Sequence, residues 1–386
     1  MKQIVIFGCR DGQYLYEQLR KYQIDNIIFC DNNVDLQGTV IDGKKIVSVD
    51  DLLKLSRDNE ISHIIVTVRN GYNRWKIVNQ LLRNGINKNL IGLVKPSVIT
   101  YRWDIVFEKN LDSDDLFSKQ ILWLKNVTKP LIYYLEVHAS DSCNLNCKGC
   151  LHFSSLYKND ILPDIERVLS DVKRLNEKCQ IFHLRILGGE PLLNPRLGEL
   201  ITRLRSFLPD TDIGIVTNGT LITRQNKKLF EIMKENMVGF NITLYPPTYS
   251  NKDEIYKVLN EANVSYGSHR AKIDEFSKGF SLHRQSVESC KSHEVCVSKG
   301  CLFLRNGRLY KCAPEALVNR FYEKFGIGID TTNAGVDIYN NDIKWASLIQ
   351  SLYQSPVEQC LYCSNELKAF TWGVASNPII EDWIVD

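Results

Sequence analysis

The sequence lacks any long hydrophobic run. Its longest apolar stretches, such as residues 64–68, are only a few residues long, whereas a membrane-spanning helix needs roughly 20 consecutive apolar residues. The opening residues, MKQIVIFG, predict a strand, and no apolar segment with a cleavage site follows them as it would in a secretory signal. We therefore expect a cytoplasmic protein that has no membrane partner.

The sequence also lacks an excess of charge of either sign. Its 48 basic and 45 acidic side chains leave a net charge of +3, and this balance provides no bulk attraction for nucleic acid. Internal repeats and low-complexity segments are absent, and hydrophobic residues make up 44% of the 386 positions. At roughly 150 residues per domain, a globular chain of this length allows two to three domains. The composition does not indicate an oligomeric state.

Cysteine, by contrast, is abundant. The chain has twelve cysteines, and nine of them fall in two clusters, at residues 143–150 and 290–363. In a reducing compartment, clustered cysteines indicate metal or redox chemistry rather than disulfides. The other three, Cys9, Cys30 and Cys179, are expected to be small buried residues.

The first 98 residues predict a small α/β domain. Short β-branched runs alternate with helical patterns, and this alternation predicts a parallel, doubly wound sheet. We expect strands at residues 5–7, 27–29, 63–68 and 90–93, and helices through residues 15–22 and 73–83. Residues 99–129 predict a linker with a helix around residues 116–124.

A second alternating series, with longer units, begins at residue 131. We expect its strands at residues 133–138, 182–186, 212–217 and 239–244, and its helices at residues 164–176, 197–207 and 227–235. From about residue 281 the pattern changes to a cysteine-rich segment with a short hairpin. We therefore divide the chain into an N-terminal block (1–98), a linker (99–129), a central block (130–280) and a C-terminal block (281–386).

Three cysteines follow the first strand of the central block directly. Cys143, Cys147 and Cys150 form a C-x3-C-x2-C triplet, and on a loop at the carboxyl end of a strand their thiolates can face one point. Thiolates are the usual ligands of iron–sulfur clusters. Three ligands leave one iron of a 4Fe–4S cluster open, and that iron can chelate a small molecule. The alternatives are chance or a structural zinc site, although zinc sites usually pair two C-x2-C units.

Here the sequence resembles the radical S-adenosylmethionine (SAM) enzymes. The resemblance rests on the segment CNLNCKGC at residues 143–150 and on Gly188-Gly189-Glu190-Pro191, which follows the second strand and matches the family's GGE motif. It covers roughly residues 130–270. It implies an α/β fold in which the central block is a partial (β/α)6 barrel, the radical SAM core.

The resemblance also implies cofactors and residue roles. The triplet would hold a 4Fe–4S cluster, and SAM would bind its open iron. The expected SAM contacts fall at the carboxyl ends of the strands: Gly188, Gly189, Glu190, Thr217, Asn218 and Thr243. The GGE segment would bind the amino group of the methionyl moiety, and Thr243 with Tyr245 would lie near the ribose. Glu190 has a simpler interpretation, as a carboxylate at a helix N-terminus.

One position departs from the family pattern. The residue before the third cysteine is usually aromatic and packs near the adenine, but here it is Gly149. His152 and Phe153 are the nearby rings that could supply this contact instead. His152 could equally be an ordinary polar loop residue.

The C-terminal cysteines indicate a second cluster. Asn306-Gly307 is a strong signal for a tight hairpin, and Cys301 and Cys312 flank it; Cys360 and Cys363 add a C-x2-C pair. These four cysteines resemble the ligands of the twitch or SPASM domains that follow radical SAM barrels, and the shorter twitch form, with one auxiliary 4Fe–4S cluster, fits better.

Three points about this second cluster stay open. Cys296 also lies at an allowed distance before the hairpin and could replace Cys301. A structural zinc ion in the same four thiolates is an alternative to the cluster. Cys290 has no assignment and is interpreted as a free thiol.

The N-terminal block carries a weaker signal. Residues 8–12, GCRDG, follow the first strand and open a helix, where backbone N–H groups can bind phosphate. Asp31 ends the second strand, where a carboxylate can hold a ribose hydroxyl. The block resembles Rossmann-like domains found before enzymes of sugar and polysaccharide assembly, including nucleotide-sugar binders. A docking or dimerisation module is the alternative.

The resemblance implies a radical SAM oxidoreductase. In this family an electron from the cluster cleaves SAM to methionine and a 5′-deoxyadenosyl radical, which removes hydrogen from an unactivated C–H bond. We expect a small sugar-like or nucleotide-sugar substrate and a dehydrogenation, since an auxiliary cluster can accept an electron. An external donor such as flavodoxin or ferredoxin would be the partner.

Two other functions stay open. Peptide-modifying maturases or epimerases share these domains, but such maturases usually carry an N-terminal winged-helix domain, which the β/α pattern of residues 1–98 disfavours. A non-catalytic iron–sulfur electron-transfer protein would not need the GGE motif.

Overall fold

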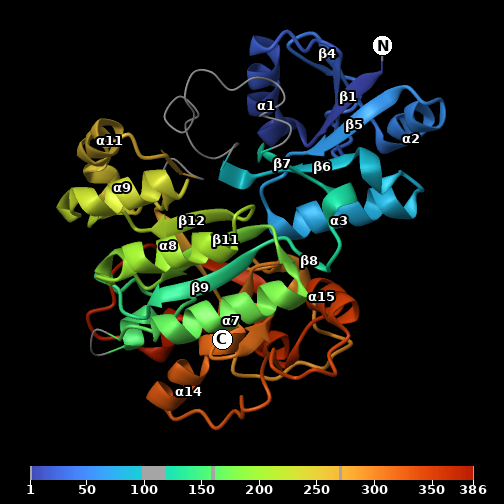
Figure 1. The fold of residues 1–386 in the computed structure, drawn as a ribbon. Helices are drawn as coiled ribbons and strands as arrows, with labels where there is room; N and C mark the ends of the chain where they lie inside the picture. Colours follow the sequence, from blue (N-terminus) through green and yellow to red (C-terminus); the bar gives the residue numbers. More distant parts are fainter. Residues whose placement is uncertain (1, 98–118, 158–160, 269–271, 386) are drawn as a thin grey trace.

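The computed structural model describes residues 2–97, 119–157, 161–268 and 272–385 (Figure 1). Most of the expected linker, and the first part of the helix expected around residues 116–124, lie outside these ranges. The N-terminal block lies at the top of Figure 1, the central block in the middle and the cysteine-rich block at the bottom. Within the described ranges, no helix is both long and apolar enough to cross a membrane.

The N-terminal block is built on a mostly parallel sheet. Its strands are β1 (Gln3–Phe7), β2 (Ile27–Cys30), β3 (Val40–Ile41), β4 (Lys44–Val47), β5 (Ile61–Val66), β6 (Ile91–Val94) and β7 (Ile121–Trp123). Their order is β3-β4-β2-β1-β5-β6-β7, with β4, β2, β1, β5 and β6 parallel. The helices are α1 (Cys9–Lys21), α2 (Val49–Arg57) and α3 (Gly71–Arg83). The doubly wound arrangement and the four expected strands are confirmed.

Two local expectations need correction. Residues 121–123 form β7, antiparallel to β6, rather than part of a helix. The reason is that Ile121 and Trp123 are buried while Leu122 between them is only half-buried, and this alternation suits an edge strand. The sequence interpretation also missed β4 and α2; α2 begins at a capping box formed by Ser48 and Asp51.

The central block contains a parallel sheet that matches the expected β/α series. Its consecutive strands are β9 (Leu135–Ser140), β11 (His183–Gly188), β12 (Asp212–Thr217), β13 (Gly239–Ile242) and β14 (Tyr266–Gly267). The helices α7 (Ile165–Lys178), α8 (Leu197–Phe207), α9 (Lys227–Glu235) and α11 (Lys252–Glu261) connect them. Figure 1 shows α7 and α8 in front of β9 and β11. The mixed α/β fold with parallel sheets is confirmed.

The C-terminal block completes this sheet and then crosses its mouth. β16 (Leu302–Arg305) pairs parallel with β9, and the hairpin continues into β17 (Arg308–Tyr310) and β18 (Val336–Asp337). The predicted tight turn is confirmed, because Asn306 and Gly307 both have positive φ, 49° and 76°. β15 (Glu275–Phe280) does not join the sheet in the described residues but pairs antiparallel with β19 (Cys363–Thr371).

The remaining C-terminal elements are short helices around the cysteines. They are α12 (Ser292–Val295), α13 (Ala313–Leu317), α14 (Asn319–Phe325), α15 (Trp345–Gln354) and the 3-10 helix η6 (Glu358–Tyr362). One continuous hydrophobic core joins the N-terminal and central sheets, with members such as Val66 and Leu135. The central sheet is therefore held between the other two blocks.

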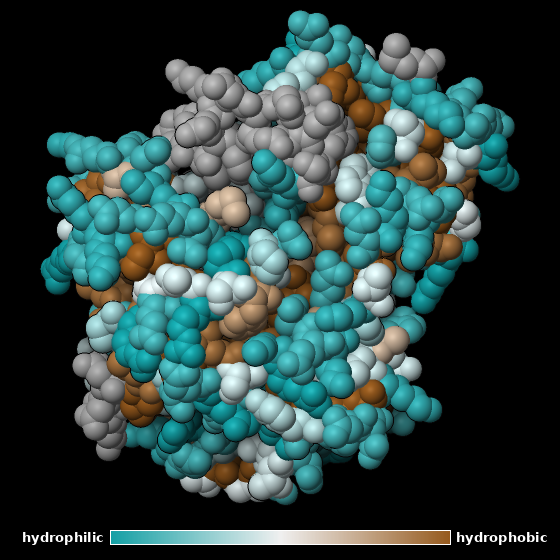
Figure 2. Space-filling view, viewed as in Figure 1, coloured by the Kyte–Doolittle hydropathy of each residue, from teal (hydrophilic) through white to brown (hydrophobic). Residues whose placement is uncertain are grey.

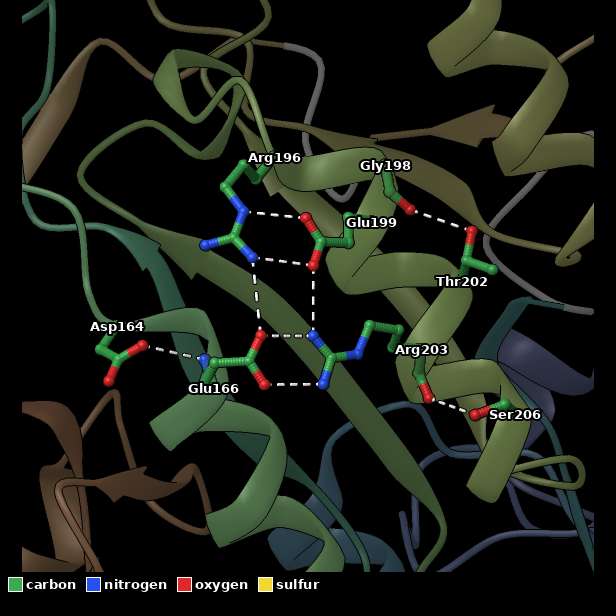
Figure 3. Close-up of polar contacts among 8 residues, drawn as sticks. All are labelled: Asp164, Glu166, Arg196, Gly198, Glu199, Thr202, Arg203 and Ser206. Carbon is green, nitrogen blue, oxygen red and sulfur yellow. Dashed lines mark hydrogen bonds and ion pairs between the residues drawn. The ribbon is translucent and has the colours of Figure 1, made fainter.

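The outer helices face solvent and are tied by ion pairs. In Figure 3, Arg203 on α8 bonds Glu166 on α7, with Nη2 and Oε2 2.7 Å apart. Arg196 also binds Glu199 through two 2.8 Å hydrogen bonds. Figure 2 shows mainly hydrophilic residues over this region. Exposed pairs of this kind contribute little stability each, so we regard them as a solvated face rather than a site.

Candidate functional site

The predicted motifs meet at one edge of the central sheet. The cysteine triplet follows β9, the GGE segment ends β11, Thr217 and Asn218 end β12, and Thr243 follows β13. Because these strands are parallel and adjacent, their carboxyl ends lie together. The Thr243 N–H donates to the Thr217 carbonyl at 2.9 Å, which joins the last two strand ends.

The two glycines of the GGE segment allow close packing of backbones. Gly188 has φ +149°, and a Cβ there would lie 1.8 Å from the Ser140 carbonyl oxygen. A Cβ on Gly189 would lie 2.1 Å from the Ser142 carbonyl oxygen. Without side chains, the Gly189 N–H donates to the Ser140 carbonyl at 2.7 Å. The GGE segment is thereby held directly against the chain that leads to Cys143.

Glu190 holds the next loop in place. Its fully buried carboxylate accepts hydrogen bonds from the Thr217 hydroxyl at 2.7 Å and from the Asn218 N–H at 2.8 Å. It also accepts from the Leu192 N–H at 3.1 Å, so the helix N-terminal interpretation of this carboxylate is confirmed. Burial raises the pKa of Glu190 to about 7, against the lowering effect of these hydrogen bonds. Glu190 is therefore a positioning residue for the Thr217-Asn218 loop.

The three triplet thiols lie near one another. The charge of Cys150 raises the pKa of both Cys143 and Cys147, although burial is the larger cause in each case. Burial takes these two pKa values to about 11 and about 12. Tyr245, after β13, faces the group, since all three thiols add to the rise that burial produces in its pKa. Within the described ranges, no group of three or more His, Cys, Asp or Glu side chains has the geometry to hold a metal ion.

N–H groups point at two of the thiols. Asn218 Nδ2 is 3.7 Å from Cys143 Sγ and 2.8 Å from Asn144 Oδ1. Trp372, just beyond β19, donates its indole N–H to Cys147 Sγ at 3.2 Å. These donors suit sulfur that carries negative charge, as it does when it binds iron.

The C-terminal tail lies over the cysteine loop. The Lys148 N–H donates to the Gly373 carbonyl at 2.8 Å, and the Ala375 N–H donates to the Asn146 carbonyl at 2.7 Å. Trp383 donates its indole N–H to the Cys150 carbonyl at 2.9 Å. Residues of the C-terminal block thus cover the cysteine loop of the central block.

Aromatic rings of the C-terminal block occupy the space beside Gly149. A Cβ on Gly149, whose φ is +62°, would lie 2.8 Å from Cζ of Phe370 on β19. Phe370 packs edge-on against Phe276, which packs against Tyr245 at 5.5 Å. Tyr245 also stacks on Trp372, with ring centroids 5.9 Å apart. The ring of Phe370 therefore lies where a side chain at position 149 would point.

The two rings that the sequence offered for this contact, those of His152 and Phe153, pack against other parts of the protein. Phe153 is fully buried and packs against Phe280, Phe321 and Trp383 in the C-terminal core. His152 Nδ1 lies 2.8 Å from His138 Nε2. Both rings are therefore engaged by protein partners.

His152 ends a polar chain behind the cysteine loop. His138 Nδ1 is 2.7 Å from Asp141 Oδ1, and Arg305 on β16 donates to both oxygens of Asp141 at 2.8 and 2.7 Å. Burial lowers the pKa of His152 to about 3, so this ring is neutral. This network of polar side chains anchors β16 to the start of the cysteine loop.

The C-terminal cysteines converge on a second cavity. This cavity opens to solvent, and four cysteines line it: Cys296, Cys312, Cys360 and Cys363. Burial raises the pKa of all four thiols. Among the described residues, Cys301 does not line this cavity; after burial, the main influence on its pKa is the charge of Glu136.

The other cysteines have protein surroundings. Cys290 Sγ lies 3.2 Å from Ser292 Oγ and 3.4 Å from the Cys360 carbonyl oxygen. Cys9, Cys30 and Cys179 are at most 2% exposed, as expected for small buried residues. All twelve cysteines are free thiols, which agrees with the expectation that they do not form disulfides.

The residues predicted to contact a nucleotide in the N-terminal block have contacts within the protein. Asp31 accepts hydrogen bonds from the Cys9 N–H at 2.8 Å and the Asn33 N–H at 2.9 Å. Asp31 therefore binds the first turn of α1. Gly12 packs in the interior, where a Cβ would lie 2.4 Å from Ile6 Cγ2.

The sequence interpretation missed Trp372 and Trp383, which contact the cysteine loop, and it did not favour Cys296 as a ligand. The signal for Trp372 was present, since Phe370 and Trp372 alternate along a strand that starts at Cys363. For Cys296 the spacing to the hairpin was compatible, but only the fold shows which cysteine reaches the cavity.

Comparison with known proteins agrees with this geometry. Residues 137–271 match the Radical SAM superfamily. A segment is 33% identical over 115 residues to GTP 3′,8-cyclase of Trichodesmium erythraeum, covering 29% of this chain and 34% of that protein. Another is 26% identical over 147 residues to GTP 3′,8-cyclase of Staphylococcus epidermidis, covering 36% of this chain and 41% of that protein. The chain thus spans less than half the length of these curated relatives.

Solved structures show more distant likenesses. BtrN in complex with AdoMet and 2-DOIA is 18% identical, with 61% of this chain and 94% of that chain covered and a TM-score of 0.38. Native anSMEcpe with bound AdoMet is 22% identical, with 36% and 44% covered and a TM-score of 0.29. The motifs at the strand ends and the superfamily match lead to one conclusion: residues 137–271 of this chain are a domain of the radical SAM superfamily.

Proposed function

We propose that the chain is a radical SAM enzyme. The observation that carries this proposal is the convergence of the Cys143, Cys147 and Cys150 thiols with the GGE segment at the carboxyl ends of β9 and β11. The chemistry of the donors fits a 4Fe–4S cluster, because buried thiols with N–H donors aimed at them suit anionic sulfur. When bound, the cluster and SAM supply a 5′-deoxyadenosyl radical.

The chain's own residues would position and enclose these groups. The backbone at Gly188 and Gly189 and the loop at Thr217 and Asn218 would bind SAM, with Thr243 near its ribose. Glu190 would fix that loop through the two hydrogen bonds that it accepts from Thr217 and Asn218. The rings of Tyr245, Phe276, Phe370 and Trp372 would exclude water from the mouth of the sheet, where a radical must be protected from quenching.

A second cluster would lie in the C-terminal cavity. Cys296, Cys312, Cys360 and Cys363 line one space, so we propose Cys296 in place of Cys301 as its fourth ligand. Lys311 also lines the cavity and is 4% exposed, and its positive charge suits an anionic group. Such a cluster would supply an electron acceptor.

We propose a small nucleotide or sugar-like substrate and a dehydrogenation. The curated relatives are named GTP 3′,8-cyclase, so a nucleotide-containing substrate is compatible with this domain. The substrate would lose one hydrogen atom to the deoxyadenosyl radical, and then one electron to the second cluster and one proton to solvent, so that two hydrogens are removed in total. A flavodoxin or ferredoxin would deliver the electron that starts the reaction.

Anaerobic reconstitution with iron, sulfide and dithionite tests the proposal. The wild-type protein should convert SAM to 5′-deoxyadenosine, and the Cys143→Ala/Cys147→Ala/Cys150→Ala variant should form none while losing about half of the bound iron, because one of two clusters is gone. Cys290→Ala is the matched control and should retain both the iron and the cleavage. No cleavage by the wild-type protein under any reductant, or cleavage by the triple variant, would refute the proposal.

A further inference from the structure

The indole of Trp372 makes an unusual contact with the proposed cluster loop. Its N–H donates to the sulfur of Cys147, with Nε1 and Sγ 3.2 Å apart, across 225 residues of sequence. A donor at this position therefore favours negative charge on the sulfur.

The ring of Trp372 is held in this orientation by three neighbours. Its own backbone N–H donates to the Asp274 carbonyl at 2.8 Å. One face of the indole stacks on Tyr245 with an interplanar angle of 18°. Two residues further, Val374 forms a β-bridge with Cys147 itself. The tail and the cysteine loop thus lie side by side like two short antiparallel strands. The hydrogen bond from the Trp372 indole to the Cys147 sulfur lies beside this bridge.

Hydrogen bonds to cluster sulfur have a defined electrostatic effect. A 4Fe–4S cluster gains one negative charge on reduction, and an N–H dipole aimed at a ligand sulfur stabilises the more negative state. Such a bond raises the reduction potential. Removing it makes the cluster harder to reduce.

We propose that Trp372 tunes the reduction potential of the barrel cluster through its N–H···S bond to Cys147, so that docking of the C-terminal tail sets how readily the cluster accepts its electron. This inference rests on the proposed function. Trp372 acts through Cys147 and not on a substrate. Its side chain comes from the end of β19, whose first residue, Cys363, lines the second cavity. One strand therefore links the two cysteine sites.

The chain contains a matched control in Trp383. Its indole N–H donates to the Cys150 backbone carbonyl at 2.9 Å rather than to a sulfur. Both tryptophans therefore bind the same loop, but only Trp372 places a donor on a thiolate. Replacement by phenylalanine removes the N–H and keeps an aromatic ring in each case.

The experiment is a redox titration of the reconstituted full-length protein followed by electron paramagnetic resonance. The signal that changes on addition of SAM identifies the barrel cluster, because only an open iron binds it. Trp372→Phe should lower the equilibrium constant for reduction of this cluster about tenfold, which is a fall of about 59 mV for one electron. Trp383→Phe should leave the midpoint unchanged.

A second measurement does not depend on how the variant folds. Wild-type protein labelled with 15N-tryptophan should show a nitrogen coupling to the reduced barrel cluster in double-resonance spectra, and this coupling should persist in Trp383→Phe. Equal midpoints in wild type and Trp372→Phe, or no tryptophan coupling in the wild type, would overturn the inference. A wild-type protein that forms no SAM-responsive cluster would instead refute the proposed function.

Discussion

The buried carboxylate of Glu190 predicts a specific dependence of stability on pH. Burial raises its pKa from an ordinary value of 4.5 to about 7. The folded protein therefore holds this proton more tightly than the unfolded chain does. Stability from this group is fully present below about pH 4.5 and is lost as the pH rises toward 7, because deprotonation leaves a buried charge.

The size of the effect follows from the difference between the two pKa values. Between pH 5 and pH 8, a shift from 4.5 to about 7 lowers the free energy of unfolding by about 2.5 kcal/mol. Glu190→Gln removes the titration and, at any pH, loses about one hydrogen bond, since the amide cannot accept from every donor around it. The variant should therefore be less stable than wild type at pH 5 and should lose less stability on going to pH 8.

Urea unfolding of the metal-free protein at pH 5, 6, 7 and 8 measures this difference. The free energy of unfolding of wild type minus that of Glu190→Gln should fall by about 2.5 kcal/mol over this range. Glu231→Gln, on the exposed side of α9, controls for the loss of one carboxylate. If the curves for wild type and Glu190→Gln run parallel, burial does not govern the ionisation of Glu190, and the reasoning fails.

Three further predictions concern the other blocks. Cys296→Ala should lose about half of the reconstituted iron while Cys301→Ala keeps nearly all of it, because Cys296 lines the C-terminal cavity and Cys301 does not. Iron analysis of both variants measures this difference. The reverse pattern would restore Cys301 as the ligand. Asp31→Ala should destabilise the N-terminal block by about 1 kcal/mol through loss of the bond to the Cys9 N–H, with SAM cleavage retained. Gly12→Asp should abolish soluble expression instead, because its Cβ would overlap Ile6; a soluble, folded Gly12→Asp protein would contradict this packing.

The sequence was most informative where periodicity is strong and motifs are short. The bounds expected for β12, α8 and α9 agree with the structure, because buried β-branched runs and amphipathic helices carry the signal locally. The strand ends that hold the cysteine triplet, the GGE segment and Asn218 followed from the same alternation, since parallel strands bring their carboxyl ends together. The Asn306-Gly307 turn was predicted from two residues alone.

The sequence was least informative where distant segments meet. Trp372 contacts Cys147 only because β19 pairs with β15 and turns back over the mouth of the sheet. The choice between Cys296 and Cys301 depends on the path of α12, which no local pattern encodes. The contacts of Asp31 could not be predicted for a related reason: an acidic residue after a strand can bind a ligand or the neighbouring helix, and both uses give the same sequence.

The tail over the cysteine loop also has a consequence for the order of events during synthesis. Cys147 leaves the ribosome 225 residues before Trp372, an interval of about 11 to 45 seconds at roughly 5–20 residues per second. Contacts of such long sequence separation form late. Throughout this interval the tail cannot cover the triplet, and its arrival then closes the loop. Loading of the proposed cluster would therefore meet fewer covering residues on the nascent chain than in the finished protein.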